Sequence, residues 1–264
     1  MYALVRDPAK AARLSKLGVA PILGDLDDRR SLTKVAGLGD IVLYFAPPDR
    51  QSHIDTRTRN LLSALSTRLL PTRLIYISTS GVYGDCGGDV VSETRPLNPQ
   101  SERARLRVSA EQQIRAWATR NHANANILRV PGIIAEDRLP IDRIKAGTPA
   151  IVASEDSYSN HIHADDLARI VIAALRYAKP NRVYHTANDD GMKMGDYFDV
   201  VADAFELPRP TRLPRAEVQS VVSPTMWSFM NESRRLTNLR MKKELKATLR
   251  YPTVASVLKT PPQA

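Results

Sequence analysis

Hydroxyl side chains concentrate in the segment Ile-Ser-Thr-Ser-Gly-Val-Tyr-Gly at residues 77–84, directly after an apolar run. A hydroxyl at the end of a strand can hydrogen-bond the oxygen of a reacting group, or it can satisfy the backbone of a turn. The phenol of Tyr83 could move a proton. Cys86, in the glycine-rich loop that follows, could react if it were exposed near a cation, and is otherwise a passive thiol.

Metal chemistry and disulfides are not expected. Cys86 is the single cysteine, and the chain contains neither a Cys/His cluster nor a Cys-x-x-Cys pair. His161 and His163 are two residues apart on an extended segment, and we expect them to make structural hydrogen bonds. The sequence lacks an apolar run of membrane-spanning length, and its first residues lack the order of a secretory signal. We expect a cytoplasmic protein without metal or membrane partner.

The net charge of +10 raises the question of nucleic-acid binding. Most of this excess is local, because residues 209–264 contain 11 Lys and Arg against three Asp and Glu. These cations have no regular aromatic spacing and no zinc-finger or RNP-like pattern. A solvated basic face, or a rim that binds a phosphate-bearing small molecule, is therefore favoured over a nucleic-acid site.

From Tyr2 to about Asn188 the chain alternates β-branched apolar runs with helical patterns, which is typical of a parallel sheet covered by helices. The expected strands are Tyr2–Val5, Ala20–Leu23, Ile41–Phe45, Leu74–Ile77, Ile127–Val130 and Val183–His185. The expected helices are Pro8–Leu17, Ser52–Leu65, Ser101–Arg120 and Asp165–Tyr177, the last capped by Asp165 or Asp166. After about Asp189 the chain becomes richer in Pro, Met and basic residues and loses this alternation. We therefore predict a first domain of residues 1–188 and a small C-terminal region of residues 189–264.

Two motifs follow neighbouring expected strands, Gly-Asp-Leu-Asp at residues 24–27 and Phe-Ala-Pro-Pro at residues 45–48. An open α/β sheet binds its ligand at such carboxyl ends. Together with residues 77–84, and with His-Ile-His-Ala-Asp-Asp at residues 161–166, they resemble the extended or atypical short-chain dehydrogenases/reductases of the NAD-dependent epimerase/dehydratase type. The resemblance covers nearly the whole chain. It implies a Rossmann-like, doubly wound parallel sheet with a small, mostly helical C-terminal substrate cap.

The resemblance also implies positions for a dinucleotide. Asp25 and Leu26 would flank the adenine, and Phe45, Ala46 and Pro47 would pass beside the ribose and the pyrophosphate. Pro131 lies in the segment that would pack beside the nicotinamide. Arg6 directly follows the first expected strand, which favours NADP, although Asp7 leaves NAD open.

At the catalytic positions the chain departs from the family. The resemblance places Thr79 as the hydroxyl that orients the reacting oxygen. It places Arg103 and Arg107 where family members carry the Tyr and Lys of a Tyr-x-x-x-Lys motif. Because a guanidinium stays protonated, Arg103 cannot be an efficient general acid or base, whereas Arg107 could still hydrogen-bond ribose hydroxyls. The alternative is an arginine-rich exposed helix face. Tyr83 is then the nearest substitute proton donor.

The family's first strand and its glycine-rich turn have no counterpart here, because residue 1 already resembles the second strand. That strand normally lies at the centre of the sheet, so its absence should split the hydrogen-bond ladder and leave a hydrophobic trough. We accordingly expect roughly 20 to 30 further residues upstream in the natural protein, since a βαβ unit needs about 30.

We therefore predict an NAD(P)-binding oxidoreductase or epimerase that acts on a carbonyl or secondary alcohol of a small-molecule substrate. The alternative is a dinucleotide-binding sensor or scaffold without catalysis. Arg138 is the candidate cation for an anionic substrate, and Cys86 lies in the loop that would cover the substrate pocket. Family members commonly dimerise through two long helices, here Ser52–Leu65 and Ser101–Arg120, with Ile114 and Trp117 as apolar anchors.

Overall fold

The structure is a computed structural model that describes residues 1–49 and 52–259. Its chain forms two compact units that interleave along the sequence. Unit 1 comprises Met1–Ser78, Glu102–Ile127 and Lys179–Arg182, and unit 2 comprises Thr79–Ser101, Leu128–Ala178 and Val183–Ala264. The predicted boundary after residue 188 does not coincide with a boundary between these units, so the division into a cofactor region and a substrate region stays a prediction.

Unit 1 begins with alternating strands and helices whose ends lie within a few residues of the predicted ones, except for the 3-10 helix η1, which was not predicted. They are β1 (Tyr2–Val5), α1 (Pro8–Lys16), β2 (Ala20–Leu23), the 3-10 helix η1 (Arg29–Val35), β3 (Ile41–Tyr44), α2 (Thr56–Leu65), β4 (Arg73–Thr79), α3 (Glu102–Arg120) and the start of β6 (Asn124–Val130). Helix α1 begins where Asp7 caps it, its side chain accepting from the Ala9 backbone amide, and where Pro8 supplies a fixed φ.

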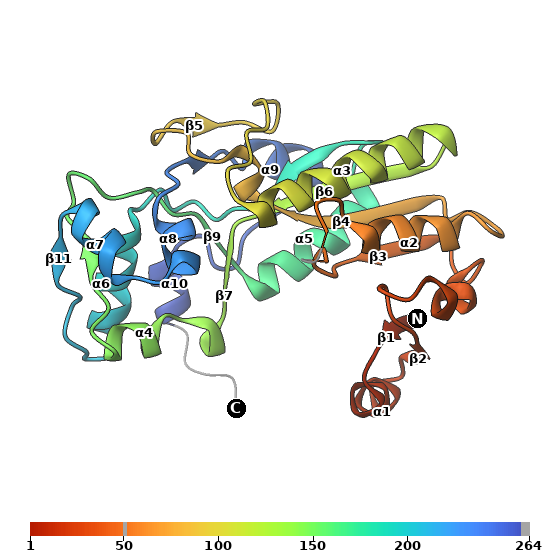
Figure 1. Ribbon diagram of the computed structural model, residues 1–264, viewed down its shortest axis with the longest axis horizontal. Coiled ribbons are helices and arrows are strands. Elements are labelled where there is room, and N and C mark those ends of the chain that lie inside the picture. Colours follow the sequence, from red (N-terminus) through yellow and green to blue (C-terminus); the bar gives the residue numbers. More distant parts are fainter. Residues whose placement is uncertain (50–51, 260–264) are drawn as a thin grey trace. The chain divides into compact units, whose positions relative to one another are not determined.

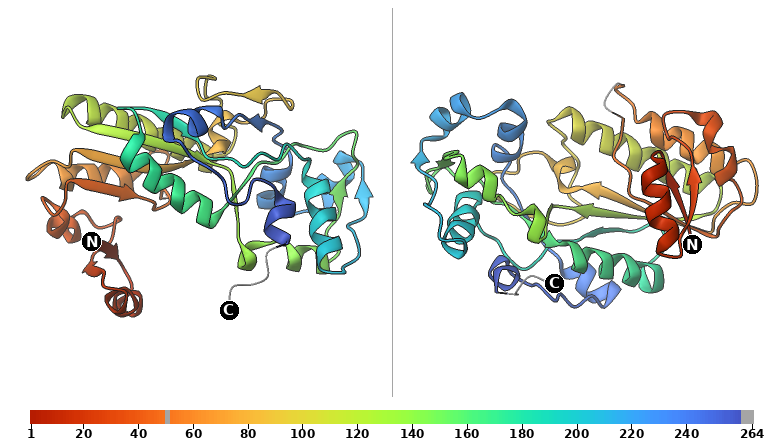
Figure 2. Two further views of the ribbon diagram at one scale, coloured as in Figure 1. Left: turned by 180° about the vertical axis from the view of Figure 1, so that it is seen from behind. Right: turned by 90° about the horizontal axis from the view of Figure 1, so that it is seen from below.

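Strands β1, β2, β3, β4 and β6 belong to two separate sheets. Strands β1 and β2 pair with each other, and the larger sheet has the order β10-β6-β4-β3, with β10 spanning Val183–His185. Figures 1 and 2 show β1, β2 and α1 apart from β3. On β3 and just after it, the apolar side chains Ile41, Leu43 and Phe45 are 51%, 41% and 45% exposed. The predicted split of the ladder is therefore confirmed, and so is the exposure of apolar surface beside it.

Helices α2 and α3 pack side by side within unit 1. Trp117 on α3 is buried, and its indole N–H donates to Ser66 Oγ at the end of α2, 2.9 Å away. Ile114 is also fully buried. The expectation that these two residues anchor a dimer is wrong, because each chain already covers them with its own core.

Unit 2 contains three short parallel pairs, β7 with β9, β8 with β11, and β5 with β12. These strands are β5 (Val90–Val91), β7 (Gly132–Ile134), β8 (Ala150–Ile151), β9 (His161–His163), β11 (Arg212–Leu213) and β12 (Arg235–Leu236). Its helices are α4 (Ile141–Lys145), α5 (Ala164–Tyr177), α6 (Met194–Ala204), α7 (Arg215–Val221), α8 (Pro224–Met230), α9 (Leu239–Leu245) and α10 (Val254–Leu258), with the 3-10 helices η2 (Ser80–Tyr83) and η3 (Glu136–Arg138). One core cluster gathers apolar residues of β7, β8, α4, α6 and α10. The chain after residue 189 is mostly helical, as predicted.

The N-terminus of α5 differs from the prediction. His163 is the capping residue, and its Nδ1 accepts from the Asp165 backbone amide at 3.2 Å. Asp166 is buried and accepts instead from the backbone amides of Arg250 and Tyr251, at 2.9 and 2.8 Å. Asp165 and Asp166 therefore lie in the first turn of α5, where their negative charge interacts favourably with the helix dipole, but neither residue caps the helix.

Candidate functional site

The carboxyl ends of β2 and β3 are joined through one arginine of α2. Arg57 binds Asp27 with two hydrogen bonds, Nε to Oδ1 at 2.7 Å and Nη2 to Oδ2 at 2.6 Å. Its third nitrogen, Nη1, donates to the Pro47 carbonyl at 3.2 Å. This hydrogen-bonded pair lowers the pKa of Asp27 below its usual value, so the carboxylate stays ionised. Arg57 thus fixes the two loops that the sequence assigns to a dinucleotide.

Arg6 faces the same loop from the end of β1. Its Nη1 lies 3.7 Å from Asp25 Oδ2 and 3.8 Å from Asp27 Oδ2, which are ion-pair distances longer than hydrogen bonds. The Arg6 side chain is 65% exposed. Leu26 between the two carboxylates is held by its carbonyl, which accepts from Asn60 at 2.8 Å. Arg6, Asp25 and Leu26 are thus brought together at one edge, with the cation open to solvent.

Arg107 lies at the carboxyl ends of β3 and β4. Its Nη1 donates to the Tyr76 hydroxyl at 2.9 Å, to the Ile77 carbonyl at 2.7 Å and, more weakly, to the Ala46 carbonyl at 3.5 Å. Nε and Nη2 have no hydrogen-bond partner among the described residues. The side chain is half-buried, so the alternative of an exposed arginine face does not apply to this residue.

A buried polar chain supports Arg107 from below. The rings of Tyr76 and Tyr44 lie 5.2 Å apart, and burial raises the pKa of both phenols above the usual value. Thr58 Oγ1 is 3.2 Å from the Tyr44 hydroxyl and donates to Asp55 Oδ2 at 2.5 Å. Both phenols therefore stay protonated and uncharged, and this row of hydrogen-bonded side chains supports the position of Arg107.

Glu111 holds the same strand one helical turn beyond Arg107. Both Glu111 and Ser78 are buried, and the Ser78 hydroxyl donates to Glu111 Oε1 at 2.6 Å. The sequence offered no signal for this pair, because its members are 33 positions apart. A polar residue every fourth position on α3, at Arg107 and Glu111, could have indicated that this face packs against strand ends.

Thr79 ends β4 and caps η2, accepting from the Gly81 backbone amide at 3.2 Å. The hydroxyl proton of Thr79 has no acceptor within residues 1–49 and 52–259. A half-buried hydroxyl of this kind serves the turn through its lone pair and can still donate its proton to another oxygen.

Tyr83 is enclosed in a buried network of unit 2. His185 Nδ1 lies 3.0 Å from the Thr237 carbonyl, which can only accept, so Nδ1 carries the proton and Nε2 accepts. The Tyr83 hydroxyl therefore donates to His185 Nε2 at 2.6 Å, while it accepts from Arg129 Nη1 at 2.6 Å. Burial lowers the pKa of His185 to about 3, so the imidazole remains neutral. The Tyr83 hydroxyl thus already donates one hydrogen bond and accepts another within the protein, which indicates a structural role for this residue.

Cys86 is buried beside the same turn. Its thiol lies 3.9 Å from the Tyr83 carbonyl and 3.7 Å from the Gly84 carbonyl. Burial raises the pKa of the thiol, with smaller opposing effects from Arg95 and Arg234. Of the two roles considered for Cys86 from the sequence, reactive or passive, these surroundings favour the passive thiol.

The other candidate residues lie in different places. Arg103 is half-buried on α3, Pro131 precedes β7, and Arg138 is exposed at the end of η3. His161 stacks on Tyr197 at a centroid distance of 4.1 Å and hydrogen-bonds Ser159, which matches the structural role expected for it.

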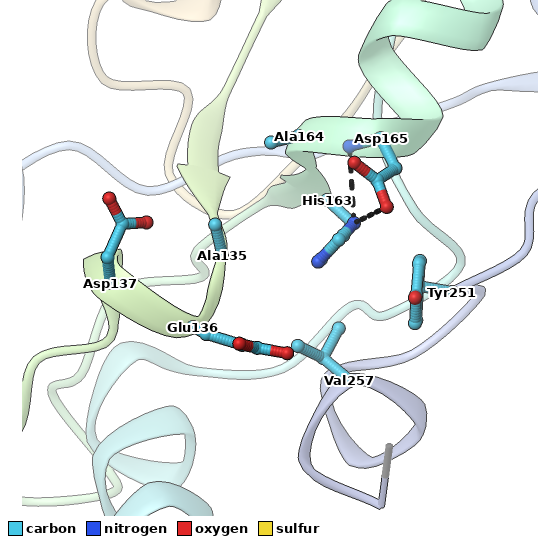
Figure 3. Close-up of a pocket in the computed structure, with 8 residues that line it drawn as sticks. All are labelled: Ala135, Glu136, Asp137, His163, Ala164, Asp165, Tyr251 and Val257. Carbon is cyan, nitrogen blue, oxygen red and sulfur yellow. Dashed lines mark hydrogen bonds and ion pairs between the residues drawn. The ribbon is translucent and has the colours of Figure 1, made fainter. Parts of the chain in front are cut away.

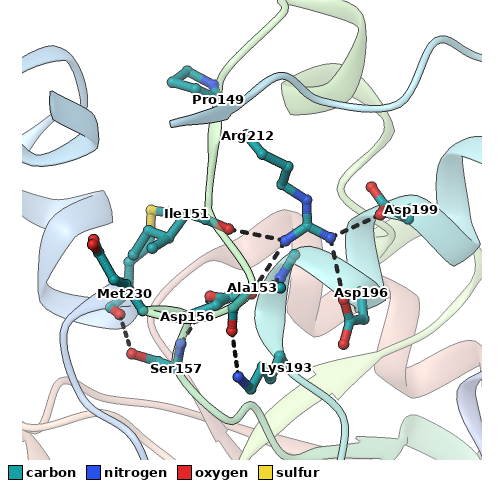
Figure 4. Close-up of polar contacts among 12 residues, drawn as sticks. Pro149, Ile151, Ala153, Asp156, Ser157, Lys193, Asp196, Asp199, Arg212 and Met230 are labelled. Carbon is teal, nitrogen blue, oxygen red and sulfur yellow. Dashed lines mark hydrogen bonds and ion pairs between the residues drawn. The ribbon is translucent and has the colours of Figure 1, made fainter. Parts of the chain in front are cut away.

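The chain after residue 189 is tied together by a buried carboxylate. Asp156 accepts from the backbone amides of Gly195 at 2.7 Å and Ser157 at 2.8 Å, and from Arg212 Nη1 at 3.4 Å (Figure 4). Nη2 of Arg212 donates a second hydrogen bond, to Asp199 Oδ2 on α6, at 2.7 Å. Any side chain at Gly195 would overlap the Arg212 guanidinium, so this close approach requires glycine. The network fixes β8, β11 and α6 as one framework.

Comparison with known proteins assigns the chain to a family. The model of the NAD dependent epimerase/dehydratase family matches residues 24–187, well over half of the chain. Protein YeeZ from Escherichia coli (strain K12) is 29% identical over 123 residues, which cover 47% of this chain. The match spans only 42% of the length of YeeZ.

Two solved structures share the fold. A functionally unknown conserved protein from Silicibacter pomeroyi is 28% identical with a TM-score of 0.80, covering 97% of this chain and 87% of its own. UDP-glucuronic acid 4-epimerase from Bacillus cereus, in complex with UDP-glucuronic acid and NAD, is 18% identical with a TM-score of 0.75, covering 98% and 88%. The predicted Rossmann-like α/β fold is thereby confirmed. The chain belongs to the NAD dependent epimerase/dehydratase family.

Proposed function

We propose that the chain is an NAD(P)-dependent oxidoreductase or epimerase that moves a hydride between nicotinamide and a carbonyl or secondary alcohol of a small molecule. The observation that carries the proposal is the setting of Arg107. Its guanidinium is anchored by Tyr76 and Ile77 at the strand ends, while Nε and Nη2 have no partner among the described residues. Two parallel N–H donors on a rigid fork suit the adjacent hydroxyls of a ribose.

The residues at this edge fit a dinucleotide, and NADP is the preferred form in this proposal. Because Arg57 occupies both oxygens of Asp27, Arg6 is left with ion-pair contacts only and can turn toward a 2′-phosphate. A bound nicotinamide supplies or accepts the hydride. Thr79 donates its hydroxyl proton to the reacting oxygen. An anionic group of the substrate is bound by Arg138 or by a cation of the C-terminal region, residues 189–264.

A second candidate function is dinucleotide sensing without turnover. Arginines stand at both positions of the family's Tyr and Lys, and the Tyr83 phenol is already occupied by Arg129 and His185. Neither arginine can exchange a proton efficiently near neutral pH. A homodimer through α2 and α3 stays a prediction for either function, to be checked by light scattering.

A fluorescence titration of NADPH and NADH into the chain, with circular dichroism as folding control, tests the proposal. We expect saturable binding that favours NADPH, and we expect Arg107→Ala to weaken it about ten-fold, the loss of one or two hydrogen bonds. Arg105→Ala, an exposed arginine on the same helix, is the matched control. A folded chain that binds neither nucleotide would reject the proposal. Binding without oxidation of NADPH by any carbonyl in a broad panel would favour the sensor.

A further inference from the structure

A cavity of about 260 Å³ lies within unit 2, between η3, the N-terminus of α5 and α10. Figure 3 shows the side chains that line it, among them Glu136, Asp137, His163, Asp165 and Tyr251. None of the eight lining residues is Lys or Arg. All eight belong to unit 2.

His163 directs a hydrogen-bond donor into the cavity. Its Nδ1 accepts from the Asp165 backbone amide, so in the neutral imidazole the proton is on Nε2. The residue is only 8% exposed and stacks on the Tyr251 ring at a centroid distance of 3.9 Å. Figure 3 shows the second ring nitrogen pointing toward the space between Ala135 and Glu136. Nε2 has no protein acceptor in the described part of the chain, so it is available to donate to a ligand in the cavity.

The same cavity has an uncompensated negative charge. Glu136 and Asp137 form no ion pair or hydrogen bond through their side chains with any described residue. The Asp165 carboxylate lies 4.0 Å from His163 Nδ1. Three carboxylates without a paired cation attract a positive group. Across residues 1–49 and 52–259 no three His, Cys, Asp or Glu side chains are arranged to hold a metal ion.

From these observations we infer that the cavity binds a small hydroxylated amine, of the amino-sugar or amino-alcohol class. The ammonium group lies among Glu136, Asp137 and Asp165, and an oxygen of the ligand accepts the proton of His163 Nε2. Val257 and Tyr251 provide an apolar wall for the carbon skeleton. The volume equals roughly eight to nine water molecules at about 30 Å³ each, which suits one sugar ring.

Calorimetric titration with D-glucosamine at about pH 7, where an imidazole is mostly neutral, tests the inference. N-acetyl-D-glucosamine keeps the hydroxyls and lacks the charge, so it serves as the matched ligand. We expect glucosamine to bind about five-fold more tightly, the upper range of what one solvent-screened ion pair gives. Equal binding of the two sugars, or no saturable binding of glucosamine by the folded chain, would overturn the inference.

Variants assign the binding to this cavity. Glu136→Gln combined with Asp137→Asn changes exposed side chains only, so the fold should survive and affinity for glucosamine should fall about ten-fold. His163→Ser keeps a residue that caps helices well and removes the Nε2 donor, and should weaken binding about five-fold. Glu217→Gln, an exposed carboxylate on α7, is the control that should bind as the parent does. Unchanged binding in the first double variant would place the sugar elsewhere and refute the site.

Discussion

At the scale of single residues, Arg107 combines a supporting role with the binding role proposed for it. Arg107→Lys keeps the charge, but one ammonium group cannot reproduce the planar fork that meets Tyr76 and Ile77. We expect the free energy of unfolding to fall by about 1–2 kcal/mol and nucleotide affinity to fall with it. Urea unfolding and the NADPH titration measure the two effects. Arg105→Lys is the control. An unchanged unfolding midpoint for Arg107→Lys would show that the contacts of Arg107 with Tyr76 and Ile77 do not stabilise the fold.

Tyr83 gives a second prediction at this scale. Tyr83→Phe leaves the buried Arg129 and His185 each without one partner, so stability should fall by about 1–3 kcal/mol. Turnover per folded molecule should not change, because the phenol proton is already donated to His185. Thermal unfolding combined with activity at a temperature well below the transition separates the two readouts. Tyr177→Phe removes a half-exposed phenol and should change neither. Loss of turnover with unchanged stability would make Tyr83 the proton donor after all.

At the scale of elements, helix α2 links the loops after β2 and β3 through Arg57, which hydrogen-bonds Asp27 and the Pro47 carbonyl. Arg57→Ala releases Asp27 to pair fully with Arg6, so the cation becomes less available to a 2′-phosphate. Affinity for NADPH should then fall about five- to ten-fold, while affinity for NADH changes less. Arg59→Ala, an exposed arginine on the same helix, provides the comparison. An equal loss for both nucleotides would mean that Arg57 only supports the loops.

Local sequence patterns were sufficient for strands β1, β2, β3, β4, β6 and β10 and for helices α1, α2, α3 and α5, but the short strands β5, β7, β8, β9, β11 and β12 were not predicted. β1, β2 and β10 begin and end at the predicted residues, because β-branched runs bounded by turn residues carry that information. The contacts that build the site were not predictable, since Arg57 and Asp27 are 30 positions apart and Ser78 and Glu111 are 33 apart. The cap of α5 was missed for a different reason. Asp165 fits the usual preference, but His163 already fills the capping position through Nδ1.

At the scale of the whole molecule, His161 and His185 are buried and stay neutral in the folded chain. Burial lowers the pKa of His161 from 6.5 to about 4 and that of His185 from 6.5 to about 3. In the unfolded chain both take up protons as the pH falls through 6.5. The unfolded state then binds more protons than the folded state, so stability is complete above this pH and decreases as the pH falls.

Each histidine should cost up to about 1.4 kcal/mol per pH unit below its unfolded pKa, or about 4 kcal/mol together after one and a half units. This loss precedes that from Asp27, whose pKa is lowered from 3.8 and which therefore weakens the fold only at more acidic pH. Urea unfolding at steps between pH 7.5 and 4.5 measures the histidine window, which lies above that of Asp27. His53→Gln, an exposed histidine, should leave the profile unchanged. A stability that stays level down to pH 4.5 would mean that both imidazoles are already charged in the fold, which their burial opposes.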